Sequence, residues 1–438
     1  MSKLLFSTSG QNSSQATLSG GVSESLAKSA PAIDHGLMTF RHSRRLPFHR
    51  WYPYVEGFSA NYIGLILSGF RNARAVYDPF GGCGTTLVEA SIRQIPSFYS
   101  EVNPFMRFVT ETKVNAARMA RDELTHAKGL LSKYLAILKD RKFPQRGLSV
   151  DLDQFEDVFP GRDYFAERDL RDLLVAKDIA LEICDRDDPV QRLMLLALAS
   201  VTVDCSNMTR RADLRRRRAD EYRTRRVNVR LSLESKINEI VTDLDSPGAP
   251  VALTTKVSDD ARNIGPDYNE SFDVAITSPP YLNGTNYFRN TKLELWLLDF
   301  IRSEKDLGQL RSFVVPSGIT DVSRSTPVLR KFISVEKVVD KLERHSYDVR
   351  IPRLVRVYFD RIYEVLERVH MALRPEGKLI IDIGDSRFSG ILVPTDFIVS
   401  ELAQSLGFHL SSSRTLAKRY SRDKTPLKQV ELIMEKSK

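Results

Sequence analysis

A short segment of the chain, TSPPY at residues 277–281, combines groups that could hold a polar ligand. It follows FDVAI, an apolar and partly β-branched run that predicts a short interior strand. Pro279 and Pro280 end that strand, because proline has no N–H for a sheet and its φ angle is fixed. The strand end therefore carries the Ser278 hydroxyl, stiff backbone carbonyls and the ring of Tyr281. Taken alone, these five residues are also compatible with a plain turn after a core strand.

A glycine-rich loop, DPFGGCGTT at residues 78–86, joins an earlier predicted strand to a helix that begins at Thr85 or Thr86. Its three glycines let the backbone turn tightly and approach a ligand without side-chain obstruction. The N-terminus of the following helix favours an anionic group. A triphosphate loop would need a lysine after the last glycine, whereas this loop has threonines, so it suits a carboxylate better.

Acidic residues follow the next two predicted strands. Glu101 follows the strand SFYS, where a carboxylate can accept hydrogen bonds from both hydroxyls of a ribose. Asp260, or its neighbour Asp259, follows VALTTKVS and could accept from an adenine amino group. A nucleoside that carries a carboxylate would therefore satisfy the loop and the acids together. For each acid alone, a solvated strand end explains the residue as well.

The glycine loop followed by Glu101, with TSPPY at a later strand end, resembles the cofactor loop and catalytic motif of S-adenosylmethionine-dependent DNA amino-methyltransferases. Members of that family methylate the exocyclic nitrogen of cytosine or adenine. Serine directly before the two prolines, in place of aspartate or asparagine, resembles the cytosine-N4 branch. The resemblance thus implies an enzyme that methylates cytosine N4 in a specific DNA sequence, commonly beside a restriction endonuclease that acts on the same site.

The resemblance also implies the roles of individual residues. An exocyclic amino group is a poor nucleophile because its lone pair is delocalised into the ring, and acceptors around its N–H bonds make it more reactive. Ser278 Oγ and the Pro279 carbonyl are the expected acceptors, Pro280 makes the motif rigid, and Tyr281 is expected to stack on a flipped base. The expected contacts to S-adenosyl-L-methionine come from Phe58, Asp78, Phe80, Gly81, Gly82, Gly84, Thr85, Thr86, Glu101, Asp260 and Thr277.

Three alternative functions stay open at this point. A hydroxyl and a carbonyl could also hold the amino group of adenine, which would give N6-adenine methylation of DNA. RNA could replace DNA as the substrate of an amino-methyltransferase. A nucleic-acid-binding protein could keep the fold without catalysis, although the intact TSPPY motif and glycine loop argue against this.

Basic residues are concentrated in one segment of a chain whose net charge is +9. Ten arginines lie between Arg210 and Arg230, against three acids. A solvated helix face is the usual explanation of a charge run, but so one-sided a run suits a nucleic-acid groove. A second basic region, residues 341–361, includes Tyr347 and Tyr358 as further candidates for contact with a base. The expected contacts to double-stranded DNA are Arg210, Arg211, Arg215, Arg216, Arg217 and Arg218.

The elements that must position these residues alternate between strands and helices. This alternation predicts an α/β fold with a parallel sheet, and the short final connection predicts an antiparallel last pair. With the resemblance, the expectation is a Rossmann-like class I methyltransferase fold with a seven-stranded, mostly parallel sheet and helical insertions. Its expected parts are a flexible tail (1–36), the cofactor-loop part of the core (37–104), a helix-rich basic insertion for target recognition (105–245), the catalytic part (246–302), a second insertion (303–356) and the C-terminal part of the core (357–438).

Composition excludes several other classes of protein. Cys83, Cys184 and Cys205 are widely spaced and match no zinc-ligand or disulfide framework, so we expect no metal and a reducing compartment. The longest apolar stretch is too short to cross a bilayer, and no secretory signal pattern opens the chain. The sequence therefore predicts a cytoplasmic protein without membrane contact.

Overall fold

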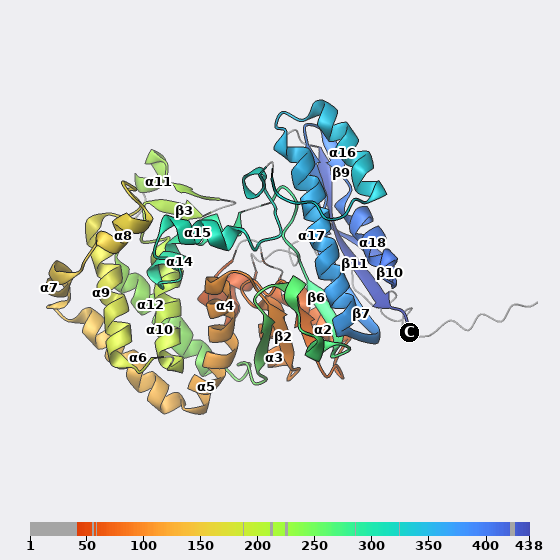
Figure 1. Cartoon of the computed structure of the whole chain (residues 1–438). Coiled ribbons are helices and arrows are strands. Elements are labelled where there is room, and N and C mark those ends of the chain that lie inside the picture. Colours follow the sequence, from red (N-terminus) through yellow and green to blue (C-terminus); the bar gives the residue numbers. More distant parts are fainter. Residues whose placement is uncertain are drawn as a thin grey trace, which may run out of the picture. The chain divides into compact units, whose positions relative to one another are not determined.

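The computed structural model describes residues 42–54, 57, 59–186, 188–210, 213–223, 227–284, 286–323, 325–420 and 425–438. The tail expected at residues 1–36 lies outside them. The described chain builds one large central sheet, with helices packed against it and a helical block that follows its second strand (Figure 1).

The central sheet has seven strands in the order β10-β11-β7-β6-β1-β2-β5. Four neighbouring pairs are parallel, whereas β11 pairs antiparallel with both β7 and β10. The structure thus confirms the predicted Rossmann-like α/β fold and its antiparallel last pair. The strands are β1 (Val76–Asp78), β2 (Ser97–Ser100), β5 (Thr254–Ser258), β6 (Phe272–Thr277), β7 (Leu373–Gly384), β10 (Phe408–Tyr420) and β11 (Pro426–Lys436).

The strand order reverses between β1 and β6. From β1 the chain adds β2 and β5 on one side, and it then returns to add β6 and β7 on the other side. Ligands of open α/β sheets bind beside the carboxyl ends of the strands at such a reversal. Both motifs follow these two strands directly, because the glycine loop leaves β1 and TSPPY closes β6.

The central strands of the sheet are buried on both faces, because helices cover them. Every residue of β1 is buried, and all of β6 except Asp273 is buried. The helices around the sheet are α2 (Ala60–Ser68), α3 (Thr85–Ile92), α4 (Pro104–Glu111), α16 (Ile333–His345), α17 (Arg350–Ala372) and α18 (Thr395–Ser405), and a short hairpin before α18 consists of β8 (Ser386–Phe388) and β9 (Ile391–Val393).

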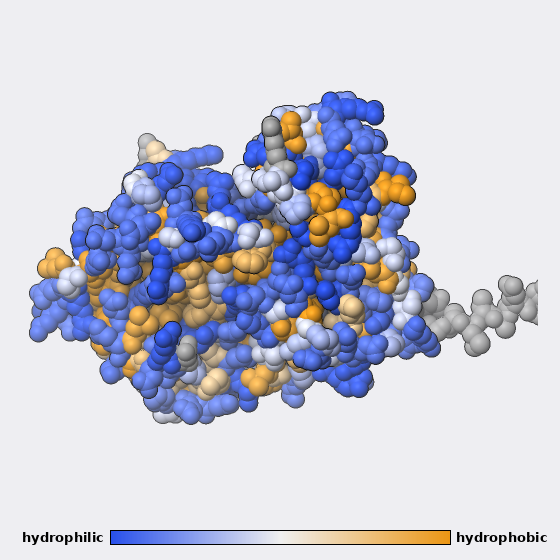
Figure 2. All heavy atoms as spheres, viewed as in Figure 1, coloured by the Kyte–Doolittle hydropathy of each residue, from blue (hydrophilic) through white to orange (hydrophobic). Residues whose placement is uncertain are grey.

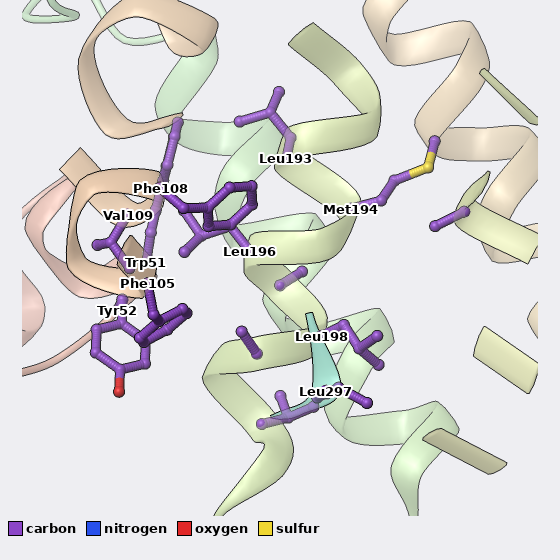
Figure 3. Close-up of a cluster of buried hydrophobic side chains, with 14 of the residues drawn as sticks. Trp51, Tyr52, Phe105, Phe108, Val109, Leu193, Met194, Leu196, Leu198 and Leu297 are labelled. Atoms are coloured by element: carbon purple, nitrogen blue, oxygen red, sulfur yellow. The ribbon is translucent and has the colours of Figure 1, made fainter. Parts of the chain in front are cut away.

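The helical block after β2 is packed into the same core as part of the sheet. Helices α6, α9, α10 and α12 lie against one another (Figure 1). Their apolar side chains pack against Trp51 of the N-terminal segment and against Phe105 and Phe108 of α4 (Figure 3). The block contains a π-helical turn (Thr112–Ala116), α5 (Ala117–Asp122), α6 (Leu124–Lys139), α7 (Phe143–Arg146), α8 (Asp153–Val158), α9 (Glu167–Ile183), α10 (Pro189–Thr202), β3 (Met208–Arg210), β4 (Leu214–Arg216), α11 (Ala219–Arg223) and α12 (Val229–Leu244).

For the segment after TSPPY, the sequence predicts one helix over about residues 290–301, and the structure differs from this prediction. The structure has two short helices, α13 (Tyr287–Asn290) and α14 (Lys292–Leu297), and then α15 (Glu304–Arg311). Asp299 has a φ of 61°, a left-handed conformation that an α-helix cannot contain. In the described part of the chain, no helix has the length and apolar character needed to span a membrane.

Candidate active site

A pocket lies at the carboxyl ends of β1, β2 and β6. The space within it amounts to about 920 Å³, part of which is open to solvent. The pocket brings together side chains from segments that are far apart in the sequence. Its lining consists of Tyr54, Gly57, Pro79, Phe80, Gly81, Gly82, Cys83, Thr85, Glu101, Val102, Asn103, Met106, Asp260, Ala261, Ser278, Pro280, Tyr287, Phe288, Phe313, Val314 and Val315.

The glycine loop needs glycine for two physical reasons. Gly82 and Gly84 have φ angles of +51° and +81°, which other residues rarely adopt. At Gly81 an added Cβ would lie 2.9 Å from the ring of Tyr99, so a side chain does not fit there. The Gly81 N–H donates to the Ser100 carbonyl at 2.9 Å, which joins the loop to β2.

Glu101 connects the glycine loop to the start of α4. One carboxylate oxygen accepts from the Gly82 N–H and the other from the Asn103 N–H, both at 2.8 Å. Loss of solvent around the carboxylate raises the pKa of Glu101 to about 7, although these two N–H donors oppose the shift. Each oxygen retains lone-pair capacity toward the pocket, as a pair of ribose hydroxyls would require.

Asp78 holds the start of the glycine loop to the end of β6. Its carboxylate accepts from the Phe80 N–H at 3.0 Å and from the Thr277 hydroxyl at 2.9 Å, which ties the end of β1 to the end of β6. Burial raises the pKa of Asp78 to about 6, against the effect of these donors. Among the described residues, Asp78, Gly84, Thr86 and Thr277 are not part of the pocket lining, although all four were predicted as cofactor contacts.

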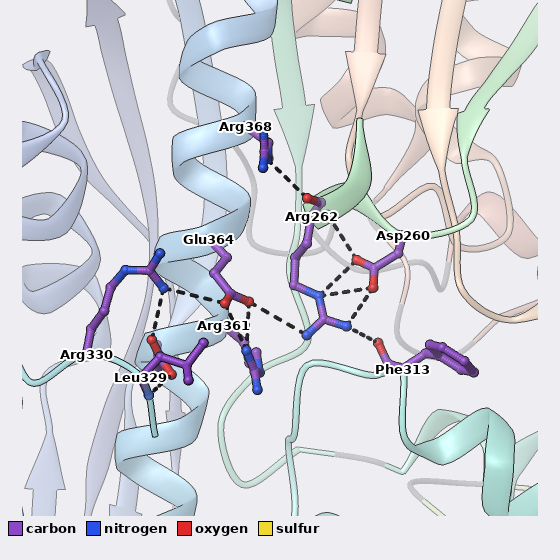
Figure 4. Close-up of polar contacts among 9 residues, drawn as sticks. Asp260, Arg262, Phe313, Leu329, Arg330, Arg361, Glu364 and Arg368 are labelled. Atoms are coloured by element: carbon purple, nitrogen blue, oxygen red, sulfur yellow. Dashed lines mark hydrogen bonds and ion pairs between the residues drawn. The ribbon is translucent and has the colours of Figure 1, made fainter. Parts of the chain in front are cut away.

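Asp260 lines the pocket, but its carboxylate is held by a neighbour. Arg262 donates from Nε at 3.0 Å and from Nη2 at 2.6 Å, and also binds the Phe313 carbonyl at 2.9 Å (Figure 4). Arg262 is linked through Glu364 to a set of ion pairs on α17 (Figure 4). Asp259, the alternative, instead forms ion pairs with Arg107 and Lys256.

The TSPPY motif presents Ser278 and Pro280 to the pocket. Within the described residues the Ser278 hydroxyl has no hydrogen-bond partner, so it is available as an acceptor. Pro279 is buried. The hydroxyl of Tyr281 donates to Asp382 Oδ1 on β7 at 2.9 Å, which fixes one end of its half-buried ring.

Several residues near the site were missed by sequence reasoning. Asn103 caps α4 and also lines the pocket, and its position before Pro104 is a readable helix-start signal. Tyr54 comes from the aromatic segment before the loop, whereas Phe313, Val314 and Val315 come from an insertion without any motif. Phe58 is outside the described residues.

Lys113 is another buried polar residue near the glycine loop that the sequence did not reveal. Its side chain is fully buried and donates to the carbonyls of His49, Tyr52 and Cys83, at 3.4, 3.1 and 3.3 Å. Burial lowers the pKa of Lys113 to about 8. This lysine therefore joins the N-terminal segment to the glycine loop.

The arginine-rich segment forms the hairpin β3–β4 and the short helix α11. Figure 2 shows mainly hydrophilic residues over this part of the molecule. Arg215 is paired with Glu221 and Arg216 with Asp163, whereas Arg217 points toward backbone carbonyls of Val203 and Ser206. Arg218 is exposed, and Arg211 lies outside the described residues.

Arg210, predicted as a contact to DNA, is held inside the protein in this structure. It donates to Glu294 at 2.5 Å and to the Tyr52 hydroxyl at 2.9 Å, and its side chain is only 11% exposed. Its Nη2 also binds the Asn290 carbonyl at 2.6 Å. A buried ion pair of this kind joins the hairpin to α14, so Arg210 has a structural position.

Tyr358, a candidate for contact with a base in the second basic region, is instead part of the protein core. It is fully buried in α17, and its hydroxyl donates to the Pro280 carbonyl at 2.9 Å. Tyr347, the other candidate, is 76% exposed. In the described ranges, no cluster of three or more His, Cys, Asp or Glu side chains could hold a metal ion.

Comparison with known proteins gives distant relatives that cover most of the chain. No protein-family model matches it. The chain is 23% identical to the Type II methyltransferase M.AvaI of Nostoc sp. over 409 residues, which span 86% of this chain and 83% of the relative. It is 23% identical over 454 residues to the Type II methyltransferase M.BsoBI of Geobacillus stearothermophilus, with 90% and 85% covered. For the Type II methyltransferase M.MvaI of Kocuria varians, the identity is 22% over 386 residues, with 82% of each covered.

Proposed function

We propose that the protein transfers a methyl group from S-adenosyl-L-methionine to the N4 amino group of cytosine in a specific sequence of double-stranded DNA. The observation that carries the proposal is that the glycine loop, Glu101 and Ser278 all line the same pocket. The relatives named Type II methyltransferases support action on DNA within a restriction-modification system. A partner endonuclease would then cut the same site.

The residues of the pocket fit S-adenosylmethionine, which when bound supplies an activated methyl group. The glycine loop and the first turn of α3 suit its carboxylate, because backbone N–H groups and the helix N-terminus favour a negative charge. Glu101 suits the two ribose hydroxyls. Asp260 lines the pocket and is the proposed acceptor for the adenine amino group, although Arg262 already donates to both of its carboxylate oxygens.

The TSPPY motif would prepare the amino group of the base. Ser278 Oγ and the Pro279 carbonyl accept the two N–H bonds, which localises the nitrogen lone pair and directs it into the new N–C bond. The alkylated nitrogen is acidic and releases one proton to water, so a strong base is unnecessary. Tyr281 would stack on the base after it leaves the duplex.

DNA contacts are assigned to the two insertions. In the arginine-rich segment, Arg218 is exposed and Arg216 is itself exposed beside Asp163, so both are candidates for phosphate contact. We propose that residues 105–245 and 303–356 together read the target sequence. Purified protein with labelled S-adenosylmethionine should label duplex DNA; label in RNA alone would refute the proposed substrate.

Cofactor affinity should depend on the protonation of Glu101. The raised pKa, about 7, means that much of Glu101 is protonated below neutral pH, and only the carboxylate accepts from both ribose hydroxyls. Affinity for S-adenosylmethionine should therefore increase as the pH rises from about 5.5 to 7.5. Isothermal titration calorimetry across this range measures the effect.

The Glu101→Gln variant is the matched control. It should bind the cofactor more weakly, by about tenfold at pH 7.5, with little pH dependence. The same raised pKa predicts that the cofactor-free protein loses stability as the pH rises through about 7, because the folded state holds the proton more tightly than the unfolded state. Equal pH profiles for the variant and the wild type would contradict the role of Glu101.

A further inference from the structure

The diproline of TSPPY can form main-chain hydrogen bonds only through its carbonyl groups. Pro279 and Pro280 have no N–H, so the main chain cannot anchor this segment by donating hydrogen bonds. In the proposed reaction, Ser278 Oγ and the Pro279 carbonyl must stay available to the substrate. The Pro280 carbonyl is the remaining point at which the protein can fix the motif.

Tyr358 occupies that point. Its hydroxyl lies 2.9 Å from the Pro280 carbonyl oxygen, and its ring is fully buried in α17. The hydrogen bond sets the plane of the peptide that joins Pro280 to Tyr281. The φ angles of both prolines are fixed by their rings. The hydrogen bond from Tyr358 therefore also limits the rotation of the Pro279 carbonyl and of Ser278.

Asp382 fixes the next residue from the other side. This carboxylate on β7 is 5% exposed and accepts from the Tyr281 hydroxyl at 2.9 Å. Gln429 on β11 donates to both of its oxygens, at 2.9 and 2.8 Å, which holds the carboxylate itself in one orientation. A stacking ring tied at its far end has little freedom to tilt.

The two residues that follow are held by the same surroundings. Ser386 donates from its hydroxyl to the Leu282 carbonyl, and the Asn283 N–H donates to the Ser317 carbonyl at 2.7 Å. At Gly284 an added Cβ would lie 2.6 Å from the Tyr281 carbonyl oxygen, so the turn is tight. The main chain is therefore held at every residue from Pro280, within the motif, to Gly284, just after it.

We propose that Tyr358 and Asp382 are positioning residues for the methyl-transfer step. Tyr358 orients the Ser278 and Pro279 acceptors through Pro280, and Asp382 orients the ring of Tyr281. This inference rests on the proposed function. Among the described residues, neither of the two lines the cofactor pocket, so their effect should fall on turnover and leave cofactor affinity unchanged.

Tyr358→Phe tests the first half of the inference. At saturating DNA and cofactor, its kcat should fall about fivefold to tenfold, with the KM for DNA and the Kd for cofactor changed less than about twofold. The matched control is Tyr363→Phe, which removes the same group from the same helix but lies against Phe332, away from the motif. A purely structural role for the Tyr358 hydroxyl would lower Tm without changing kcat at 25 °C.

Substitutions at Asp382 test the second half. Asp382→Ala should lower kcat about tenfold, whereas Asp382→Asn keeps an oxygen for the Tyr281 hydroxyl and should restore kcat to within about threefold of the wild type. If Tyr358→Phe and Asp382→Ala both keep wild-type kcat, the inference is overturned while the proposed function stands. A wild-type protein that binds cofactor but methylates no DNA would instead overturn the proposed function, and the inference with it.

Discussion

Replacing Ser278 with alanine is expected to lower the rate of methyl transfer about 100-fold to 1,000-fold, the usual cost of removing one preorganised hydrogen-bonding group from a reacting centre. Ser278 lines the pocket and its hydroxyl has no partner within the described residues, so the hydroxyl is available to a substrate. Cofactor affinity should change less than about twofold, since Gly81, Gly82 and Glu101 remain intact. Single-turnover methyl transfer and calorimetry measure the two quantities.

The matched control for this prediction is Ser271→Ala. Ser271 lies just before the opposite end of the same strand, and its hydroxyl donates to the Asn269 carbonyl at 3.2 Å. This variant should transfer methyl groups at the wild-type rate. Full activity of Ser278→Ala would show that another group holds the amino nitrogen, and loss of cofactor binding in that variant would move Ser278 to the cofactor site.

Arg210→Met is expected to lower the free energy of unfolding by about 3–5 kcal/mol, because it leaves the buried carboxylate of Glu294 without its counter-charge. The side chain of Glu294 is 1% exposed, so water cannot replace the lost donor. Tyr52 and the Asn290 carbonyl lose a donor as well. Urea unfolding followed by fluorescence measures the change.

Two further variants make this test specific. Arg218→Met, at an exposed arginine of the same segment, should change stability by less than about 0.5 kcal/mol and weaken DNA binding in a salt-dependent manner. Arg210→Met/Glu294→Leu should recover part of the stability, because it removes both charges. An Arg210→Met protein with wild-type stability and lost DNA affinity would restore Arg210 as a DNA contact.

The parts of the fold that the sequence predicted correctly depend on local signals. The strand through Tyr77, the glycine-rich turn and the helix from Thr85 follow from glycine conformation and helix-start chemistry over a few residues. The antiparallel final pair follows from its short connection. The helix expected over 290–301 was wrong in detail, because a left-handed residue at Asp299 ends the helical segment.

The parts that were missed depend on residues brought together from distant segments. In the sequence, Arg210 is one of many arginines in a basic run. Its burial is apparent only from its ion pair with Glu294, which lies on a separate helix. Phe313 to Val315 reach the pocket from an insertion whose sequence has no motif. Tyr358 stands in a basic segment, yet the packing of α17 places its hydroxyl against Pro280. Such pairings are set by tertiary packing, which periodicity and propensity do not encode.

The central claim is methylation of cytosine N4, and nucleoside mass spectrometry of cellular DNA tests it most directly. DNA from cells that express the protein is compared with DNA from cells that express Ser278→Ala at the same level. We predict N4-methylcytosine with the wild type and its loss with the variant. N6-methyladenine in place of N4-methylcytosine would contradict the assigned base, and DNA without either modified nucleoside would contradict the proposed function.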